Sequence, residues 1–268
     1  MGVNMTETDV NQLWEKLAGR PAVEAIALGG SRATGKADKK SDYDVYVYLQ
    51  GEFPACEREK ILGEFCPVME INNHYWEMED NCTLGNGVDL DIIYRRLEDF
   101  AAGIRWVVQE GNASNGYTTC MWHNLKTCRI LYDGTGRLTG LKKDFDVEYP
   151  RELKRNIVQR NMKLMNGVLP SYDMQIKKAR QRRDLVSINH RTAAFLESYF
   201  DVIFALNEMT HPGEKRLMRL CMEQCHILPA CFEENLEGLF THMFDGQGEE
   251  YLCRLVKELQ TVCSAQGF

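Results

Sequence analysis

The chain has 268 residues, of which 44% are hydrophobic and 26% charged, a composition typical of a globular protein with one large or two modest domains. Its formal charge of −7 at pH 7 argues against general affinity for nucleic acid, because neutralising a phosphate backbone requires clustered Lys and Arg. No apolar run approaches the ~20 residues that span a bilayer, and no signal peptide precedes the first predicted helix, so we expect no membrane association. The ten cysteines lie mostly inside apolar segments, and we therefore expect reduced thiols in the cytoplasm.

The first half of the chain mixes predicted helices and strands. Apolar residues at helical spacing predict a first helix that Gly19 and Pro21 close, and the apolar run 23–28 predicts a buried strand. The patterns that follow predict a loop and short helix over 31–37, strands over 41–49, 68–71, 74–78, 88–94 and 129–132, and helices over 57–65 and 97–109. Asn81 and the run Gly85-Asn86-Gly87 have the composition of turns.

The pattern changes near Tyr149-Pro150, after which helical periods dominate and strand signals vanish. Helices are predicted over 151–169, 172–186, 193–206 and 215–225, with two more to the end of the chain. The segment 193–206 is apolar on nearly every side, which indicates a central, buried helix. We therefore expect an α+β protein, with a mixed sheet and flanking helices over residues 1–148 and an all-α bundle over 149–268.

Two carboxylates and a glycine turn form the most informative motif. Gly29-Gly30-Ser31 follows the first predicted strand, and Asp42 and Asp44 lie on the next one. Because side chains alternate along a strand, Asp42 and Asp44 point to the same face. Neighbouring carboxylates repel each other, so the pair predicts a divalent cation such as Mg²⁺, which takes further oxygen ligands from substrate phosphates. The glycines allow the backbone to approach those phosphates closely.

A third carboxylate is expected from the segment Val88-Asp89-Leu90-Asp91-Ile92-Ile93-Tyr94. Asp89 and Asp91 share a face of this predicted strand, so either one can complete the pair. Three acids, two metal ions and a nucleoside triphosphate are the components of in-line phosphoryl or nucleotidyl transfer.

These motifs resemble the polymerase-beta-type nucleotidyltransferase superfamily: G-G-S, then D-x-D on the next strand, then an Asp flanked by hydrophobic residues on a later strand. Within it the chain is similar to bacterial aminoglycoside and lincosamide nucleotidyltransferases and to a related uncharacterised two-domain family. Segments 131–136, 204–207 and 212–215 extend the resemblance over most of the chain. The resemblance implies a catalytic domain over 1–148 and a helical substrate-binding domain over 149–268. It also implies transfer of a nucleoside monophosphate from ATP or another NTP to a hydroxyl of a small antibiotic-like acceptor, such as an aminoglycoside or lincosamide. AMP is the preferred candidate for the transferred group, and two Mg²⁺ ions are the expected cofactors.

The resemblance also implies roles for individual residues. Asp42, Asp44 and Asp91 become the catalytic metal ligands, with Asp91 preferred to Asp89 because the D-I-I-Y-R run after it matches the family more closely. The nucleotide-binding residues are Gly29, Gly30, Ser31 and Arg32 together with Asp42 and Asp44, although Arg32 either clamps phosphate or faces solvent. The accessory candidates are Asp89, as a base or as part of the acceptor pocket, Arg180, and Asp184.

Alternatives remain open from the sequence. The same chemistry can serve a protein or tRNA acceptor, although the acidic charge counts against it, or the chain can be a nucleotide-binding sensor without turnover. Cys221, Cys225 and His226 lie close enough on a helix to suggest a metal site, but buried apolar packing of the two thiols is the favoured interpretation. We expect a monomer or homodimer whose partners are the nucleotide and a small acceptor.

Overall fold

The computed structural model describes residues 7–35, 37–38, 41–167 and 169–268. Position 36 of the loop and helix predicted over 31–37, and position 168 of the helix predicted over 151–169, therefore lie outside the described residues. The chain forms two compact units. The first takes in the described residues up to Ile104 together with Asn124–Val147, and the second comprises Arg105–His123 and Glu148–Phe268. The α+β class expected from the sequence is confirmed, with a mixed sheet and flanking helices first and a helical region after it.

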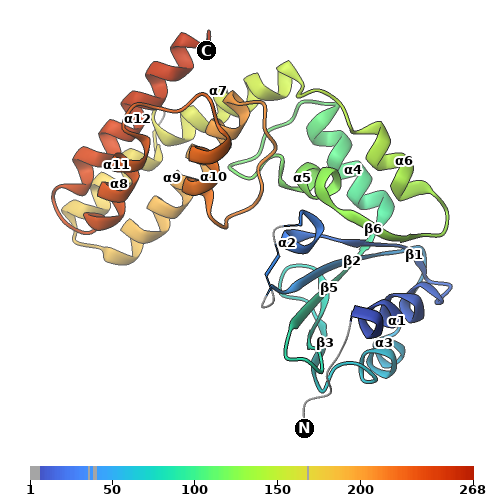
Figure 1. The fold of residues 1–268 in the computed structure, drawn as a ribbon. Coiled ribbons are helices and arrows are strands. Elements are labelled where there is room, and N and C mark those ends of the chain that lie inside the picture. The colour runs from blue at the N-terminus through green and yellow to red at the C-terminus, as the bar shows by residue number, and fades with distance from the viewer. Residues whose placement is uncertain (1–6, 36, 39–40, 168) are drawn as a thin grey trace. The chain divides into compact units, whose positions relative to one another are not determined.

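The first unit contains a six-stranded sheet in the order β3-β4-β5-β2-β1-β6 (Figure 1). Its strands are β1 (Val23–Leu28), β2 (Tyr43–Leu49), β3 (Val68–Asn73), β4 (Met78–Thr83), β5 (Asp89–Arg96) and β6 (Arg129–Asp133). Only β2 and β5 pair in parallel, and the other neighbours are antiparallel. The parallel pair forms the centre of the sheet, and it carries the aspartates that the sequence singles out.

One face of this sheet carries the hydrophobic core of the first unit. Helices α1 (Glu7–Ala18) and α3 (Ala55–Leu62) cover it, and their apolar residues meet Val45 and Val47 of β2 and Leu90 and Ile92 of β5. Because side chains alternate along a strand, Asp44 and Asp91 face the opposite side. The remaining helices of this part of the chain are α2 (Gly30–Ala33), α4 (Leu97–Val108), α5 (Cys120–Thr127) and α6 (Arg137–Asp144).

The hairpin β3–β4 differs from the prediction. The strand expected over 74–78 begins only at Met78, and Asn81, predicted in a turn, lies inside β4. A buried ion pair helps to set this register: Arg58 Nη1 lies 2.6 Å from Asp80 Oδ1, and the same oxygen accepts the Asn72 backbone N–H at 2.8 Å. Neither α5 nor α6 was predicted from the sequence.

The second unit is helical. It contains α7 (Arg151–Met165), α8 (Tyr172–Gln181), α9 (Leu185–Leu206), α10 (Leu217–Gln224), α11 (Phe232–Thr241) and α12 (Gly248–Ala265). Helix α9 is almost entirely buried over its last turns, as its composition predicts. The single helix expected over 172–186 is wrong: Arg183 adopts a left-handed conformation with φ 54°, and α8 and α9 are separate helices.

The segment before α5 packs against helices of the second unit through buried polar contacts. Asp201 of α9 accepts hydrogen bonds from the Thr118 backbone N–H at 3.0 Å, from the Thr118 hydroxyl at 2.6 Å and from Asn161 at 3.1 Å. Asn156 donates to the Gly111 carbonyl at 2.8 Å. These bonds explain why residues 105–123 group with the second unit, since buried polar groups require such partners.

All ten cysteines lie in the described ranges, and each carries a free thiol. Cys221 and Cys225 are both buried, and Cys225 Sγ contacts the Met209 sulfur at 4.0 Å. None of the helices in the described part of the chain combines the length and apolar character needed to cross a membrane.

Candidate active site

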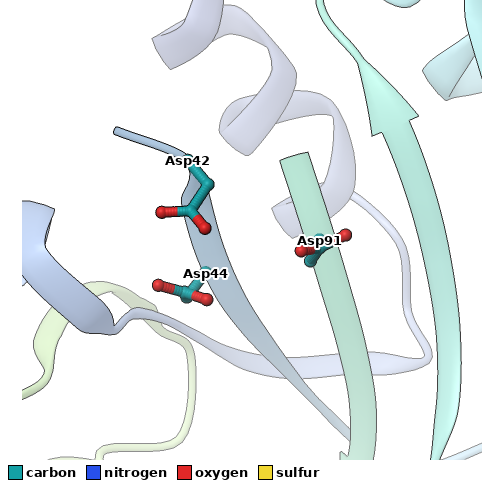
Figure 2. A group of neighbouring side chains, drawn as sticks. All are labelled: Asp42, Asp44 and Asp91. Atoms are coloured by element: carbon teal, nitrogen blue, oxygen red, sulfur yellow. The ribbon is translucent and has the colours of Figure 1, made fainter. Parts of the chain in front are cut away.

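Three aspartates converge on the face of the sheet opposite the core of the first unit. Asp42 precedes β2, Asp44 lies within it, and Asp91 is the β5 residue paired with Asp44 in the parallel register. One carboxylate oxygen of each residue lies within 4.8 Å of the other two, and all three residues are half-buried. Figure 2 shows Asp42 and Asp44 close together at the beginning of β2, with Asp91 on the neighbouring strand. Among the described residues, these aspartates are the one group of three or more Asp, Glu, His or Cys side chains that lie close enough together to share a metal ion.

The turn after β1 lies directly against this cluster. The Gly29 N–H donates to the Asp44 carbonyl at 2.7 Å, which joins the turn to β2. Gly30 has φ +60°, and a Cβ built on it would lie 1.9 Å from Asp44 Oδ2. Only glycine permits both this left-handed conformation and this close approach of backbone to carboxylate. Ser31 follows in α2 and is half-buried.

Arg32 supports the loop before β2. Its Nε donates to the carbonyls of Ser41 at 2.9 Å and Asp42 at 3.0 Å, and its Nη2 donates to Ser41 at 2.5 Å. Its guanidinium lies 3.8 Å from the centroid of the Tyr43 ring. These contacts hold the backbone around Asp42, and the phosphate contact expected of Arg32 stays a prediction.

The two aspartates of β5 have different partners on β4. Asn81 Nδ2 donates to Asp91 Oδ1 at 2.8 Å, whereas the Thr83 hydroxyl donates to Asp89 Oδ1 at 3.0 Å. Asp89 is exposed and lies outside the three-aspartate cluster. Sequence reasoning missed Asn81, although alternation of Glu79, Asn81 and Thr83 with their neighbours could have indicated a strand face.

Arg180 and Asp184 belong to the second unit, and each has a local structural role there. Arg180 Nη2 donates to the Met243 carbonyl at 3.1 Å, and burial lowers the pKa of its guanidinium. Asp184 is the N-cap of α9, where it accepts the Ser187 N–H at 3.0 Å and the Ser187 hydroxyl at 2.7 Å. These bonds lower the pKa of the Asp184 carboxyl. Because α8 ends at Gln181 and Asp184 caps α9, the two side chains belong to different helices.

The comparisons with known proteins agree with this geometry. Residues 10–111 match the family model described as nucleotidyltransferase domain, and this range contains the glycine turn and all three aspartates. The chain therefore carries a nucleotidyltransferase domain, which supports nucleotidyltransferase activity and implies a nucleotide substrate. Residues 118–217 match a second model, a domain of unknown function (DUF4037).

Three solved structures illustrate the similarity. A nucleotidyltransferase-like protein from Exiguobacterium sibiricum 255-15 is 11% identical, covers 97% of this chain and 75% of its own, and has a TM-score of 0.44. An aminoglycoside 6-adenyltransferase from Bacillus subtilis is 10% identical over 98% of this chain and 92% of its own, with a TM-score of 0.33. The CCA-adding enzyme of Thermotoga maritima, complexed with tRNA, is 11% identical over 98% and 82%, with a TM-score of 0.28. Among curated proteins, none matches the chain.

Proposed function

We propose that this protein transfers a nucleoside monophosphate from an NTP to a hydroxyl of a small antibiotic-like acceptor in a Mg²⁺-dependent reaction. The preferred candidate for the transferred group is AMP. The observation that carries the proposal is the convergence of Asp42, Asp44 and Asp91 to within 4.8 Å beside Gly30. The choice of acceptor rests on the sequence resemblance alone.

The three carboxylates suit Mg²⁺ as a donor set. Mg²⁺ prefers oxygen ligands and is held by one or two protein carboxylates together with substrate phosphates. Asp42, Asp44 and Asp91 would hold two such ions. When bound, the metal neutralises charge on the phosphate oxygens and lowers the pKa of the acceptor hydroxyl.

The residues of the chain then position the reactants. The backbone of Gly29-Gly30-Ser31 would contact the triphosphate, and the absent Cβ of Gly30 leaves room beside Asp44. The acceptor oxygen bonds to the α-phosphorus while the bond to the β-phosphate oxygen breaks, and pyrophosphate leaves in line. The hydroxyl proton passes to water or to Asp89, an exposed carboxylate two residues from Asp91 on the same face.

The helical domain that begins near residue 149 is proposed to bind the acceptor. Arg180 and Asp184 are kept as accessory candidates within it. The bonds to Ser187 account for Asp184 without a substrate. Arg180 bonds to the Met243 carbonyl through Nη2, whereas its buried Nε and Nη1 have no hydrogen-bond partner among the described residues.

The test uses ATP labelled at the α-phosphate, Mg²⁺ and a panel of hydroxylated small molecules, proteins and tRNA, with pyrophosphate release as the second readout. The isosteric variants Asp42→Asn, Asp44→Asn and Asp91→Asn are expected to lose transfer by about 10³-fold or more, because each removes a charge that the metal site requires. Asp89→Asn on the same strand face tests the base instead: it is expected to slow transfer without changing the Mg²⁺ concentration that transfer requires, because Asp89 lies outside the three-aspartate cluster. Wild-type transfer by Asp42→Asn would refute the mechanism. If the label is found only on protein or only on tRNA, that macromolecule, and not a small molecule, is the acceptor. Nucleotide binding without transfer to any member of the panel would favour the sensor.

A further inference from the structure

Side-chain hydrogen bonds continue from the aspartate cluster across the sheet to the edge strand β3. Asn81 on β4 donates to Asp91 at 2.8 Å, and Asn73 Nδ2 on β3 donates to Asn81 Oδ1 at 2.7 Å. Asn73 Nδ2 also lies 3.4 Å from Glu70 Oε2. In the strand register Asp44 pairs with Asp91, and Asp91 with Asn81. The row thus links β2, β5, β4 and β3 on one face.

The direction of these hydrogen bonds follows from the chemistry of the groups. A carboxylate is an acceptor, so Asn81 must turn its NH₂ group toward Asp91. The Asn81 carbonyl oxygen then faces β3, where the Asn73 NH₂ group supplies its donor. Asn73 therefore selects the amide orientation of Asn81 that Asp91 needs. Both asparagines are half-buried, which limits the competition from water for these bonds.

We propose that Asn81 is a positioning residue that holds the Asp91 carboxylate in the orientation a divalent cation requires, and that Asn73 in turn orients Asn81. The inference rests on the proposed function, because it assumes that Asp91 is a metal ligand. Carboxylate ligands are commonly held by such outer hydrogen bonds, and removing the outer partner costs 10–100-fold in metal affinity or activity. Asn81 does not touch the reacting atoms and acts only through Asp91.

The structure offers a matched control one step along the same two strands. Thr83 donates to Asp89 at 3.0 Å, as Asn81 donates to Asp91 at 2.8 Å, and both pairs are direct cross-strand neighbours of β4 and β5. Only Asp91 belongs to the cluster. Thr83→Ala therefore removes a hydrogen bond of the same kind from an aspartate that the proposal leaves out of the metal site.

The test compares Asn81→Ala, Asn81→Asp, Asn73→Ala and Thr83→Ala in the full chain. Two readouts are taken: the Mg²⁺ concentration that gives half-maximal AMP transfer, and the calorimetric affinity for Mn²⁺ in the presence of a non-hydrolysable ATP analogue. We expect Asn81→Ala to weaken Mn²⁺ binding about 10-fold or more and to raise the Mg²⁺ requirement by a similar factor. Asn73→Ala is expected to have a smaller effect in the same direction, and Thr83→Ala none.

Asn81→Asp separates positioning from packing, because it keeps the shape of the side chain and replaces its donor with a charged acceptor. The positioning role predicts a loss at least as large as in Asn81→Ala, whereas a packing role predicts wild-type behaviour. If both Asn81 variants bind Mn²⁺ with wild-type affinity while Asp91→Asn abolishes transfer, the positioning role of Asn81 is refuted and the proposed function stands. Wild-type transfer in Asp91→Asn overturns the proposed function itself. Urea unfolding identifies any variant that loses the fold, and Asn73→Ala, which leaves every β4 side chain intact, then supplies the comparison.

Discussion

Replacing Gly30 with Ala tests whether the turn and the aspartate cluster form one site. The left-handed conformation at φ +60° costs a residue with a Cβ about 1–2 kcal/mol. The new Cβ would also lie 1.9 Å from Asp44 Oδ2, whereas such contacts essentially never fall below 3.0 Å. The carboxylate oxygen must therefore retreat by about 1.1 Å or the turn must move. Because a misplacement of about 1 Å in a reacting assembly can cost about 100-fold in rate, we expect a loss of that order in AMP transfer.

Gly35→Ala is the control for this experiment. Gly35 also has a positive φ, +72°, but no atom of the described residues lies within 4 Å of a Cβ built there. Both variants are expected to lose about 1–2 kcal/mol of unfolding free energy, measured in urea, since both impose the same kind of backbone strain. Only Gly30→Ala should lose transfer activity. Equal activity in the two variants would show that displacing Asp44 does not matter, and the reasoning about the site would fail.

Two further predictions concern stability. Arg58→Met should destabilise the first unit by about 3–5 kcal/mol, because Asp80 is fully buried and loses its ion-pair partner at 2.6 Å. The double variant with Asp80→Asn should recover part of this loss in urea unfolding, and no recovery would contradict an electrostatic origin. In the second unit, burial raises the pKa of Asp201 to about 6 from 3.8. The folded state therefore binds its proton more tightly, so the contribution of Asp201 to stability is largest below pH 4 and falls as pH rises to about 6. Relative to Asp201→Asn, wild type should gain about 2 kcal/mol between pH 7 and pH 4, and a difference independent of pH would refute the assignment.

The parts of the site that depend on neighbours in the chain were open to prediction from the sequence. The β1 range 23–28 is as predicted, because a continuous apolar run has few alternatives to a buried strand. The common face of Asp42 and Asp44 follows from strand alternation alone. Gly30 was identified because it lies between the apolar strand 23–28 and the strand that carries Asp44. Its left-handed φ is the conformation that a tight turn at this position needs.

Contacts between distant segments were not open to prediction in this way. Asn81 was assigned to a turn because Asn favours turns locally, yet pairing with β3 and β5 draws it into a strand. The helix expected over 172–186 is interrupted because Arg183 adopts a positive φ and Asp184 caps a new helix. Both errors arise where a long-range or capping interaction overrides local propensity.

The sequence by itself determined the fold class, the acidic motif and the turn beside it, because these depend on patterns that repeat over a few residues. Strand alternation left Asp89 and Asp91 equivalent, and the family resemblance favoured Asp91. The tertiary structure places Asp91 beside Asp42 and Asp44, since the parallel register of β2 and β5 pairs Asp44 with Asp91. The antiparallel register of β4 and β5 decides that Asn81 lies opposite Asp91 and donates to it, and the packing of the turn decides that Arg32 donates to the backbone of residues 41–42. Strand register is an interaction between segments far apart in the chain, so no local pattern specifies it.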